Sequence, residues 1–179
     1  MIKENPLVVS VGECGLDYNR NFSTKKQQRY AFREQVKLAC ELQMPLFLHE
    51  REAHKDLLEI LDDVTAENLT LPPIVVHCFT GTEEEALTYI SRGYFIGFTG
   101  TICKRDRGAH LRDLLPKIPL ERIMIETDAP FMNFKKGRKS SEPIDVVDVA
   151  RKIGQVLAIP FEEVAGTTFK TTSSFFRLD

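Results

Sequence analysis

The sequence predicts an α/β protein in which parallel strands alternate with helices that pack outside the sheet. Five short apolar runs recur along the chain, and the stretches between them have helical spacing and are long enough for crossover helices. Each run is continuously apolar, which is typical of strands buried on both faces. Periodicity alone does not decide whether such a sheet is open or closed.

The predicted strands lead into residues that can bind a metal or a phosphate. These residues are Glu13, His49, His77, Thr99 and Asp128, each at or just beyond the end of an apolar run. Pro45 opens the second run, where a parallel strand tolerates proline. The predicted strands cover residues 8–12, 45–48, 74–76, 94–98 and 123–125.

Capping signals and apolar spacing place the helices. Ser23 or Thr24 is a suitable N-cap for the first helix. Thr82 and Glu85 form a capping box for the third, and Gly93 supplies its C-terminal turn. The predicted helices cover residues 25–43, 53–64, 82–92 and 108–115, and the tail from 144 onward is helical with an interruption near 159–160.

Length and composition indicate one globular domain over residues 1–179. Apolar residues make up 42% of the chain and charged residues 28%, both ordinary for a globular protein. No apolar stretch approaches the ~20 residues needed to cross a bilayer. The start of the chain lacks the apolar core of a signal peptide. The four scattered cysteines are typical of reduced thiols, so we expect an intracellular, cytoplasmic protein, with the nucleus as an alternative.

The strand ends predict a metal site. Parallel strands that end at one level place their terminal side chains around a common pocket at the carboxyl edge of the sheet. Two imidazoles and two carboxylates gathered there are a suitable ligand set for a divalent cation. Since the net charge is only −2, any attraction to phosphate has to be local. The pattern favours a hydrolytic metalloenzyme.

Four motifs carry a resemblance to a known family. They are VGECGLDY at 11–18, LH at 48–49, VHCFTG at 76–81 and ETDAP at 126–130, and the similarity continues through GFTG at 97–100 and EP at 142–143. In order and spacing they closely resemble the signatures of the TatD family of metal-dependent deoxyribonucleases. The resemblance covers essentially the whole chain.

The resemblance implies a (β/α)8 barrel of the TIM type with its metal site at the carboxyl end. Here it implies a partial barrel of about five parallel strands with outer helices, because the first three family strands have no counterpart and a complete barrel needs at least ~200 residues. Carried over position by position, Glu13, His49, His77 and Asp128 match the metal ligands of the family. The family cleaves DNA, commonly as a 3′-to-5′ exonuclease using Mg²⁺.

The chemistry of the residues agrees with those roles. Phosphodiester hydrolysis needs an activated water and neutralised phosphoryl oxygens, and one or two divalent ions supply both. We expect Mg²⁺, while the two imidazoles would also suit Mn²⁺ or Zn²⁺. Asp128 and Glu13 are the candidate catalytic residues, with Asp128 holding or deprotonating the attacking water.

Other charged residues are candidates for contact with DNA or with the ligands. Asp17 and Glu142 match family positions, and we expect them to orient ligands or helix ends behind the site. Glu126 precedes Asp128 by two residues and shares its face, so we expect it to line the pocket as well. Basic residues after the strands are candidate substrate contacts: Arg51, Lys104, Arg105, Lys135, Lys136 and Arg138. A charge run in a solvated loop is the alternative interpretation.

Two other functions stay open. The chain could be a truncated form with little or no activity. It could also be a metal-dependent hydrolase of amides or esters, because related barrels bind metal through similar ligands. A partial barrel also leaves open edges, through which the chain could self-associate.

Overall fold

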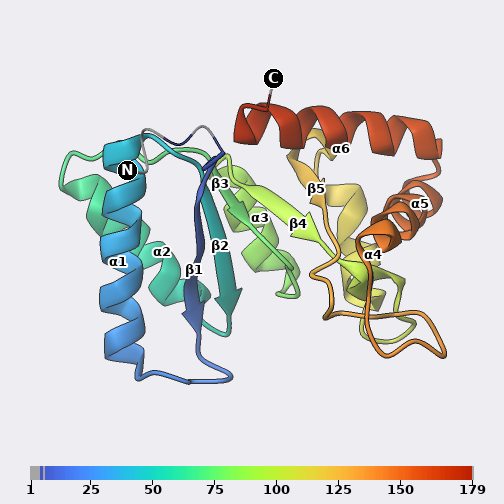
Figure 1. Ribbon diagram of the computed structural model, residues 1–179, viewed down its shortest axis with the longest axis horizontal. Helices are drawn as coiled ribbons and strands as arrows, with labels where there is room; N and C mark the ends of the chain where they lie inside the picture. Colours follow the sequence, from blue (N-terminus) through green and yellow to red (C-terminus); the bar gives the residue numbers. More distant parts are fainter. Residues whose placement is uncertain (1–4, 6, 179) are drawn as a thin grey trace. The chain divides into compact units, whose positions relative to one another are not determined.

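The computed structural model describes residue 5 and residues 7–178, which form two compact units. The first unit comprises Met1–His77 and Phe175–Asp179, and the second comprises Cys78–Ser174. Strands and helices alternate along the chain (Figure 1), which confirms the predicted α/β fold class. The expectations of a single domain and of self-association stay predictions.

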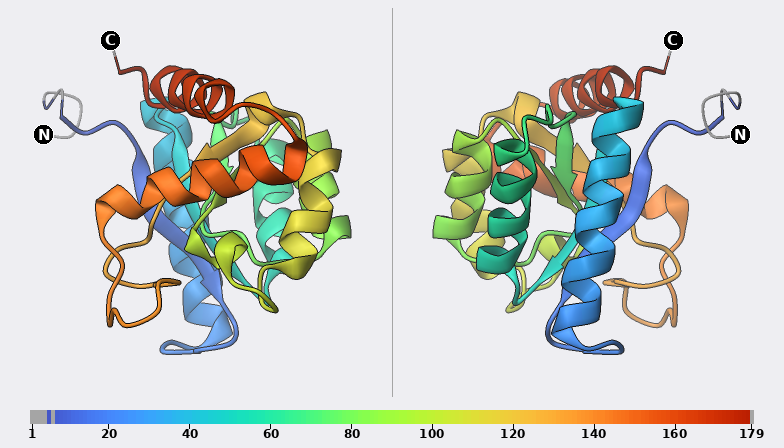
Figure 2. Two further views of the ribbon diagram at one scale, coloured as in Figure 1. Left: turned by 90° about the vertical axis from the view of Figure 1, so that its right-hand side faces the viewer. Right: turned by 90° about the vertical axis from the view of Figure 1, so that its left-hand side faces the viewer.

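The first unit is a parallel sheet backed by two helices. β1 pairs with β2, and β2 pairs with β3. Helix α1 packs against β1 and α2, as Figure 1 and the right view of Figure 2 show. The elements are β1 (Val11–Asp17), α1 (Lys25–Leu42), β2 (Leu46–Arg51), α2 (His54–Ala66) and β3 (Ile74–Val76).

Apolar side chains of the strands and helices form the core of this unit. Leu16, Phe32, Leu48 and Leu57 have no exposed surface. Each such side chain contributes roughly 1.5–3 kcal/mol when it is fully buried. Thr24 caps α1 in a capping box with Gln27. The two helices predicted for this unit, at residues 25–43 and 53–64, agree with the observed α1 and α2 boundaries to within two residues.

The predicted first strand is shifted and too short. β1 begins at Val11 and continues through Asp17, whose register partner is Arg51. The segment after Glu13 has the composition of a polar loop, with a glycine and an aspartate, but its backbone continues the ladder with β2. The second strand likewise extends to Arg51, so His49 lies inside β2 and not beyond it.

The second unit contains two strands and most of the remaining helices. β4 and β5 pair in parallel with Ile96 opposite Ile123. The capping box of Thr82 and Glu85 is present, and Gly93 has φ 79°, as the sequence predicts. The elements are α3 (Glu83–Ser91), β4 (Phe95–Phe98), α4 (Ala109–Leu114), β5 (Ile123–Ile125), α5 (Val146–Leu157) and α6 (Phe161–Phe176), the last two residues of which belong to the first unit.

Among the described residues, no helix has the length and apolar character required to span a membrane. Within the described part of the chain, no disulfide joins Cys14, Cys40, Cys78 or Cys103.

One glycine fixes the approach of β1 to β2 beside the histidine. Gly15 has φ 146°, and a Cβ built on it would lie 1.9 Å from the carbonyl oxygen of His49. Only glycine allows the two backbones to come this close. Gly15 therefore sets the position of the strand segment that carries His49.

We predict that Gly15→Ala destabilises the chain by on the order of 3 kcal/mol or more, because the new methyl group collides with a backbone atom. Gly93→Ala is the matched control, since Gly93 also has positive φ but its Cβ would meet nothing within 4 Å. The control should cost about 1 kcal/mol. Urea unfolding of both variants measures the difference, and equal losses would contradict the steric argument.

Candidate metal site

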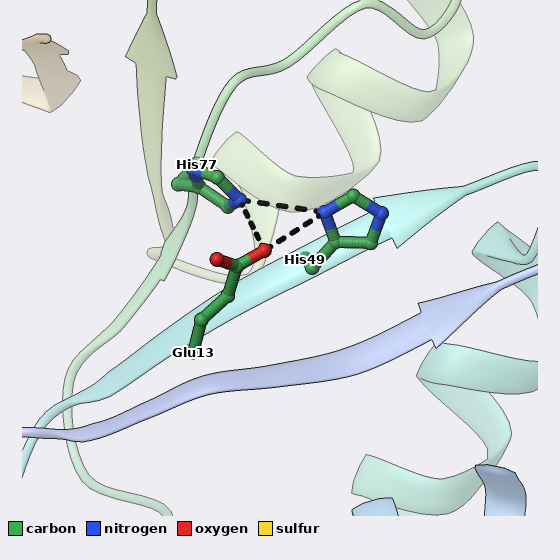
Figure 3. Close-up of side chains that lie close together, drawn as sticks. All are labelled: Glu13, His49 and His77. Atoms are coloured by element: carbon green, nitrogen blue, oxygen red, sulfur yellow. Dashed lines mark hydrogen bonds and ion pairs between the residues drawn. The ribbon is translucent and has the colours of Figure 1, made fainter. Parts of the chain in front are cut away.

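Three side chains of the first unit point toward one another (Figure 3). The Glu13 Oε1 atom lies 3.1 Å from His49 Nδ1 and 3.0 Å from His77 Nε2. The two imidazole nitrogens are 3.4 Å apart. One carboxylate oxygen and two ring nitrogens thus form a compact triangle of donor atoms.

The size of this triangle suits a shared cation. Donor atoms that bind one ion through bonds of about 2.1 Å lie about 3.0 Å apart in octahedral and about 3.4 Å apart in tetrahedral geometry. The three separations here, 3.0, 3.1 and 3.4 Å, cover that range. Imidazole nitrogen and carboxylate oxygen also suit Mn²⁺, Zn²⁺ and Mg²⁺ to different degrees. The donor set therefore fits a divalent metal.

Strand register brings the two histidines to one face. Phe47 of β2 is the partner of Val75 of β3, and His49 and His77 each follow two residues later. Because side chains alternate along a strand, both imidazoles project from the face of Phe47 and Val75. The His77 backbone N–H continues the ladder by donating to the Leu48 carbonyl at 2.9 Å.

A β-bulge places Glu13 on the same face. Gly12 pairs with Phe47 and Cys14 pairs with Leu48, so Glu13 is an extra residue in β1. A bulge of this kind re-aims a side chain, and the ladder with β2 resumes at Cys14. Glu13 can therefore face the histidines while Cys14 stays 5% exposed in the core, where burial raises the pKa of its thiol to about 12.

Asp17 supports His49 from the far side of its ring. The Asp17 Oδ2 atom lies 3.2 Å from His49 Nε2. Burial alone would raise the pKa of the Asp17 carboxyl, but the Arg20 backbone N–H and His49 lower it below its usual value. A carboxylate at this nitrogen holds the ring so that Nδ1 faces Glu13, which is the usual arrangement behind a metal-bound histidine.

Burial is graded across the cluster. His77 is 5% exposed, and its ring lies 4.8 Å from that of Phe47, whereas the Glu13 side chain is 50% exposed. A pocket of about 390 Å³ adjoins Glu13 and is lined by residues of β1, the loop after it and α1. The cluster thus has a rigid wall and a solvent-accessible carboxylate.

Asp128, the fourth expected ligand, belongs to the second unit, three residues beyond β5. Its backbone is left-handed, with φ 57°, and its carbonyl accepts a hydrogen bond from the Phe131 N–H at 2.8 Å. Aspartate tolerates this conformation better than most residues. Its membership of the metal site stays a prediction.

The expected supporting acids of the second unit have hydrogen-bond partners within that unit. The Glu126 Oε1 atom accepts from the Cys78 N–H at 2.5 Å. The Glu142 backbone N–H donates to Asp145 Oδ2 at 2.8 Å, at the residue before a turn of 3₁₀ helix. Glu142 therefore lies at a helix start, and its role behind the metal ligands stays a prediction.

The expected substrate contacts differ in their surroundings. Arg51 is exposed at the end of β2, and Lys104 follows a turn of 3₁₀ helix and is partly buried. Arg105 is 96% exposed, and Lys136 is also exposed. These four side chains are accessible to a ligand from the solvent, and their roles stay predictions.

Lys135 and Arg138 have partners within the protein. Lys135 Nζ lies 2.8 Å from Asp145 Oδ1 and 2.7 Å from Asp148 Oδ2. Arg138 pairs with the same Asp145 oxygen at 2.9 Å and with Glu142 at 2.8 Å. Both cations were predicted to contact DNA, and in the structure each has carboxylate partners on the following segment. Their contact with DNA stays a prediction.

Asp145 is the functional candidate that the sequence analysis missed. It is fully buried, and Lys135, the Glu142 backbone N–H and Arg138 together lower the pKa of its carboxyl to about 2. The signal available in the sequence was its place three residues after Glu142 at a helix start opened by Pro143, where an acid commonly caps.

The sequence is similar to known proteins over almost its whole length. A family described as "TatD related DNase" matches residues 1–177. A 3′-5′ ssDNA/RNA exonuclease TatD from Citrobacter koseri is 41% identical over 180 residues, which is 98% of this chain and 68% of that protein.

Solved structures agree with this match. The crystal structure of YjjV, a TatD homologue from Escherichia coli K12, has a TM-score of 0.83 at 31% identity, covering 99% of this chain and 68% of that one. A TatD family hydrolase from Entamoeba histolytica has a TM-score of 0.82 at 28% identity, covering 94% of this chain and 63% of that one. The chain thus spans about two thirds of the length of these relatives. The predicted fold of the (β/α)8 type agrees with the fold of these structural neighbours.

We predict that His77→Ala abolishes binding of Mn²⁺ in calorimetric titration, because it removes the most buried donor. Asp17→Asn should weaken binding about 10- to 100-fold while leaving the donors in place. Glu41→Gln, an exposed acid on α1, is the matched control and should bind as the parent does. Unchanged binding in His77→Ala would exclude the triangle as a metal site.

A second prediction concerns Asp145 and pH. Its pKa is about 2 in the folded chain and about 3.9 in an unfolded one. The native state therefore binds fewer protons, so the stabilisation is complete above about pH 4 and is lost as pH falls toward 2.

Asp145→Asn should accordingly be less stable than the parent at pH 7, and the gap should narrow as pH falls from 4 toward 2. Urea unfolding across this range measures it. Asp113→Asn, an exposed acid on α4, is the control and should stay close to the parent at every pH. A constant gap for Asp145→Asn would show that its charge is not what stabilises the fold.

Proposed function

The chain belongs to the TatD-related DNase family, and on this premise we propose that it is a metal-dependent deoxyribonuclease. The proposed reaction is hydrolysis of phosphodiester bonds, exonuclease-like from the 3′ end. The relatives named 3′-5′ ssDNA/RNA exonucleases make single-stranded nucleic acid the preferred candidate substrate. The observation that carries the proposal is the Glu13–His49–His77 triangle.

A divalent cation bound at the triangle would neutralise charge on the phosphoryl oxygens and lower the pKa of an attacking water. Glu13, His49 and His77 would hold it. Asp17 keeps His49 oriented through its contact at Nε2. The half-exposed Glu13 side chain leaves this position open to a polymer approaching from the solvent.

Asp128 is the proposed base. Its carboxylate would take a proton from the water while the water oxygen forms a bond to phosphorus. The bond from phosphorus to the leaving oxygen breaks, and that oxygen is protonated on release. The left-handed backbone of Asp128 supports a functional role, because residues in such conformations concentrate at active sites.

Mg²⁺ is the proposed ion, as one or two ions per chain, with Mn²⁺ or Zn²⁺ as alternatives favoured by two nitrogen donors. We also propose an intracellular, cytoplasmic location, which four cysteines without a disulfide among the described residues support.

The test is degradation of a 3′-labelled single-stranded DNA by the purified chain, with Mg²⁺ or with EDTA. We predict that Asp128→Asn and His77→Ala each lower the Mg²⁺-dependent rate by at least about 10³-fold, since each removes a group needed in the transition state. Circular dichroism checks that both variants fold, and Glu41→Gln is the control.

Parent-like rates in both variants would refute the proposal. A parent chain that binds metal and folds but degrades no DNA or RNA would favour the alternative of a truncated form. Turnover of an amide or a carboxylic ester without turnover of DNA would favour the other hydrolase class.

A further inference from the structure

We propose that the loop at residues 129–142 is a preformed phosphate-binding element, which presents Lys136 and Lys139 and is held in shape by Asp145. The inference rests on the proposed function, because it names the part of the chain that contacts a nucleic-acid backbone. It also divides the basic residues of this loop into two classes, two that hold the loop together and two that bind.

The base of the loop is closed by Ser141. Its backbone N–H donates to the Pro130 carbonyl at 3.0 Å, and its hydroxyl donates to the Phe131 carbonyl. Ser141 is 4% exposed. Both ends of a segment of about a dozen residues are thereby joined, as in a compact Ω-loop.

Asn133 ties the interior of the loop to itself. Its Nδ2 donates to the carbonyls of Lys135 at 3.1 Å and Arg138 at 2.6 Å, while its Oδ1 accepts from the Lys135 N–H at 3.0 Å. One amide thus satisfies three backbone groups. The turn between residues 135 and 138 has a defined conformation as a result.

Asp145 anchors the loop from behind. Its Oδ1 atom accepts from Lys135 and Arg138, and its Oδ2 atom accepts from the Glu142 N–H. A buried carboxylate with charge-assisted bonds to two side chains of one loop fixes the position of that loop. If the basic residues of the loop were only a solvated run of charge, they would not require a buried carboxylate such as Asp145 as a partner. Figure 2 shows the loop, in orange, leading into the start of α5.

Phe134 provides an apolar contact on the same loop. A Cβ built on Gly100 would lie 2.1 Å from the Phe134 ring, so the ring packs directly against that backbone. Gly100 opens the 3₁₀ turn after β4. The loop is therefore held by an apolar contact as well as by polar ones.

Lys136 and Lys139 take no part in these contacts and are accessible from the solvent. Both are exposed, and Gly137, whose φ is 80°, lies between them in the sequence. Within the described part of the chain, no ion pair is found for either lysine. A rigid loop that carries two cations on its outer turn binds phosphates at a low entropic cost, because the loop is already ordered. The ligand class that fits is the sugar–phosphate backbone of a single strand.

The first experiment measures binding of a fluorescent single-stranded DNA by anisotropy in EDTA, so that no cleavage occurs, at several salt concentrations. Lys136→Ala/Lys139→Ala should lower the slope of log K against log salt by about 1.4, since each phosphate contact contributes about 0.7. Lys26→Ala/Lys170→Ala, exposed lysines on α1 and α6, are the matched control and should leave the slope unchanged.

A double-mutant cycle tests the role of Asp145 as a positioning residue. Asp145→Asn should weaken DNA binding in the parent but have little further effect in the Lys136→Ala/Lys139→Ala background, because the loop then has no cations to position. A merely structural role for Asp145 would weaken binding equally in both backgrounds. In the Mg²⁺ assay the lysine variant should raise KM with kcat unchanged.

The outcomes separate this inference from the proposed function. Lost slope in the lysine variant supports the inference, whether or not the parent chain cleaves DNA. Parent-like binding and KM in the lysine variant, together with normal Mg²⁺-dependent cleavage by the parent, would overturn the inference and leave the nuclease proposal standing. A parent chain that neither binds nor cleaves single strands would overturn both.

Discussion

The close approach of β1 to β2 is the constraint on which the candidate site depends. Gly15 lies against the His49 carbonyl, and the bulge two residues earlier gives Glu13 its direction. Parallel pairing with β3 then adds His77 on the same face. Three donors from segments 28 and 36 residues apart therefore meet through backbone geometry. Long flexible side chains are not needed to bring them together, and a site built on rigid strands holds its geometry more precisely than one built on loops.

The sequence predicts the order of strands and helices well because each signal is local. The run before His77 is uniformly apolar, and the capping box of Thr82 is complete within four residues. The extent of β1 is not predictable in this way. Its second half has the composition of a loop, and only its ladder with β2 makes it a strand. The bulge at Glu13 is invisible for the same reason, since an extra residue is defined only against a partner strand.

The charged loop illustrates a second limit. A sequence shows that Lys135, Lys136 and Arg138 are close in the chain, but it does not show which of them have partners. Lys135 and Arg138 both pair with Asp145, which is buried at the helix start after the loop. Residues that share one charge and one segment can therefore have different roles, and side-chain partners distinguish them.

The three donor residues all lie in the first unit, between residues 13 and 77. A cation that binds them in the folded state and not in the unfolded chain is thermodynamically linked to folding of that unit. At a hundredfold excess over its dissociation constant it would add about 2.7 kcal/mol to stability. Metal supply would then govern how long the folded chain survives in a cell, and apo-protein would be the form most exposed to proteases.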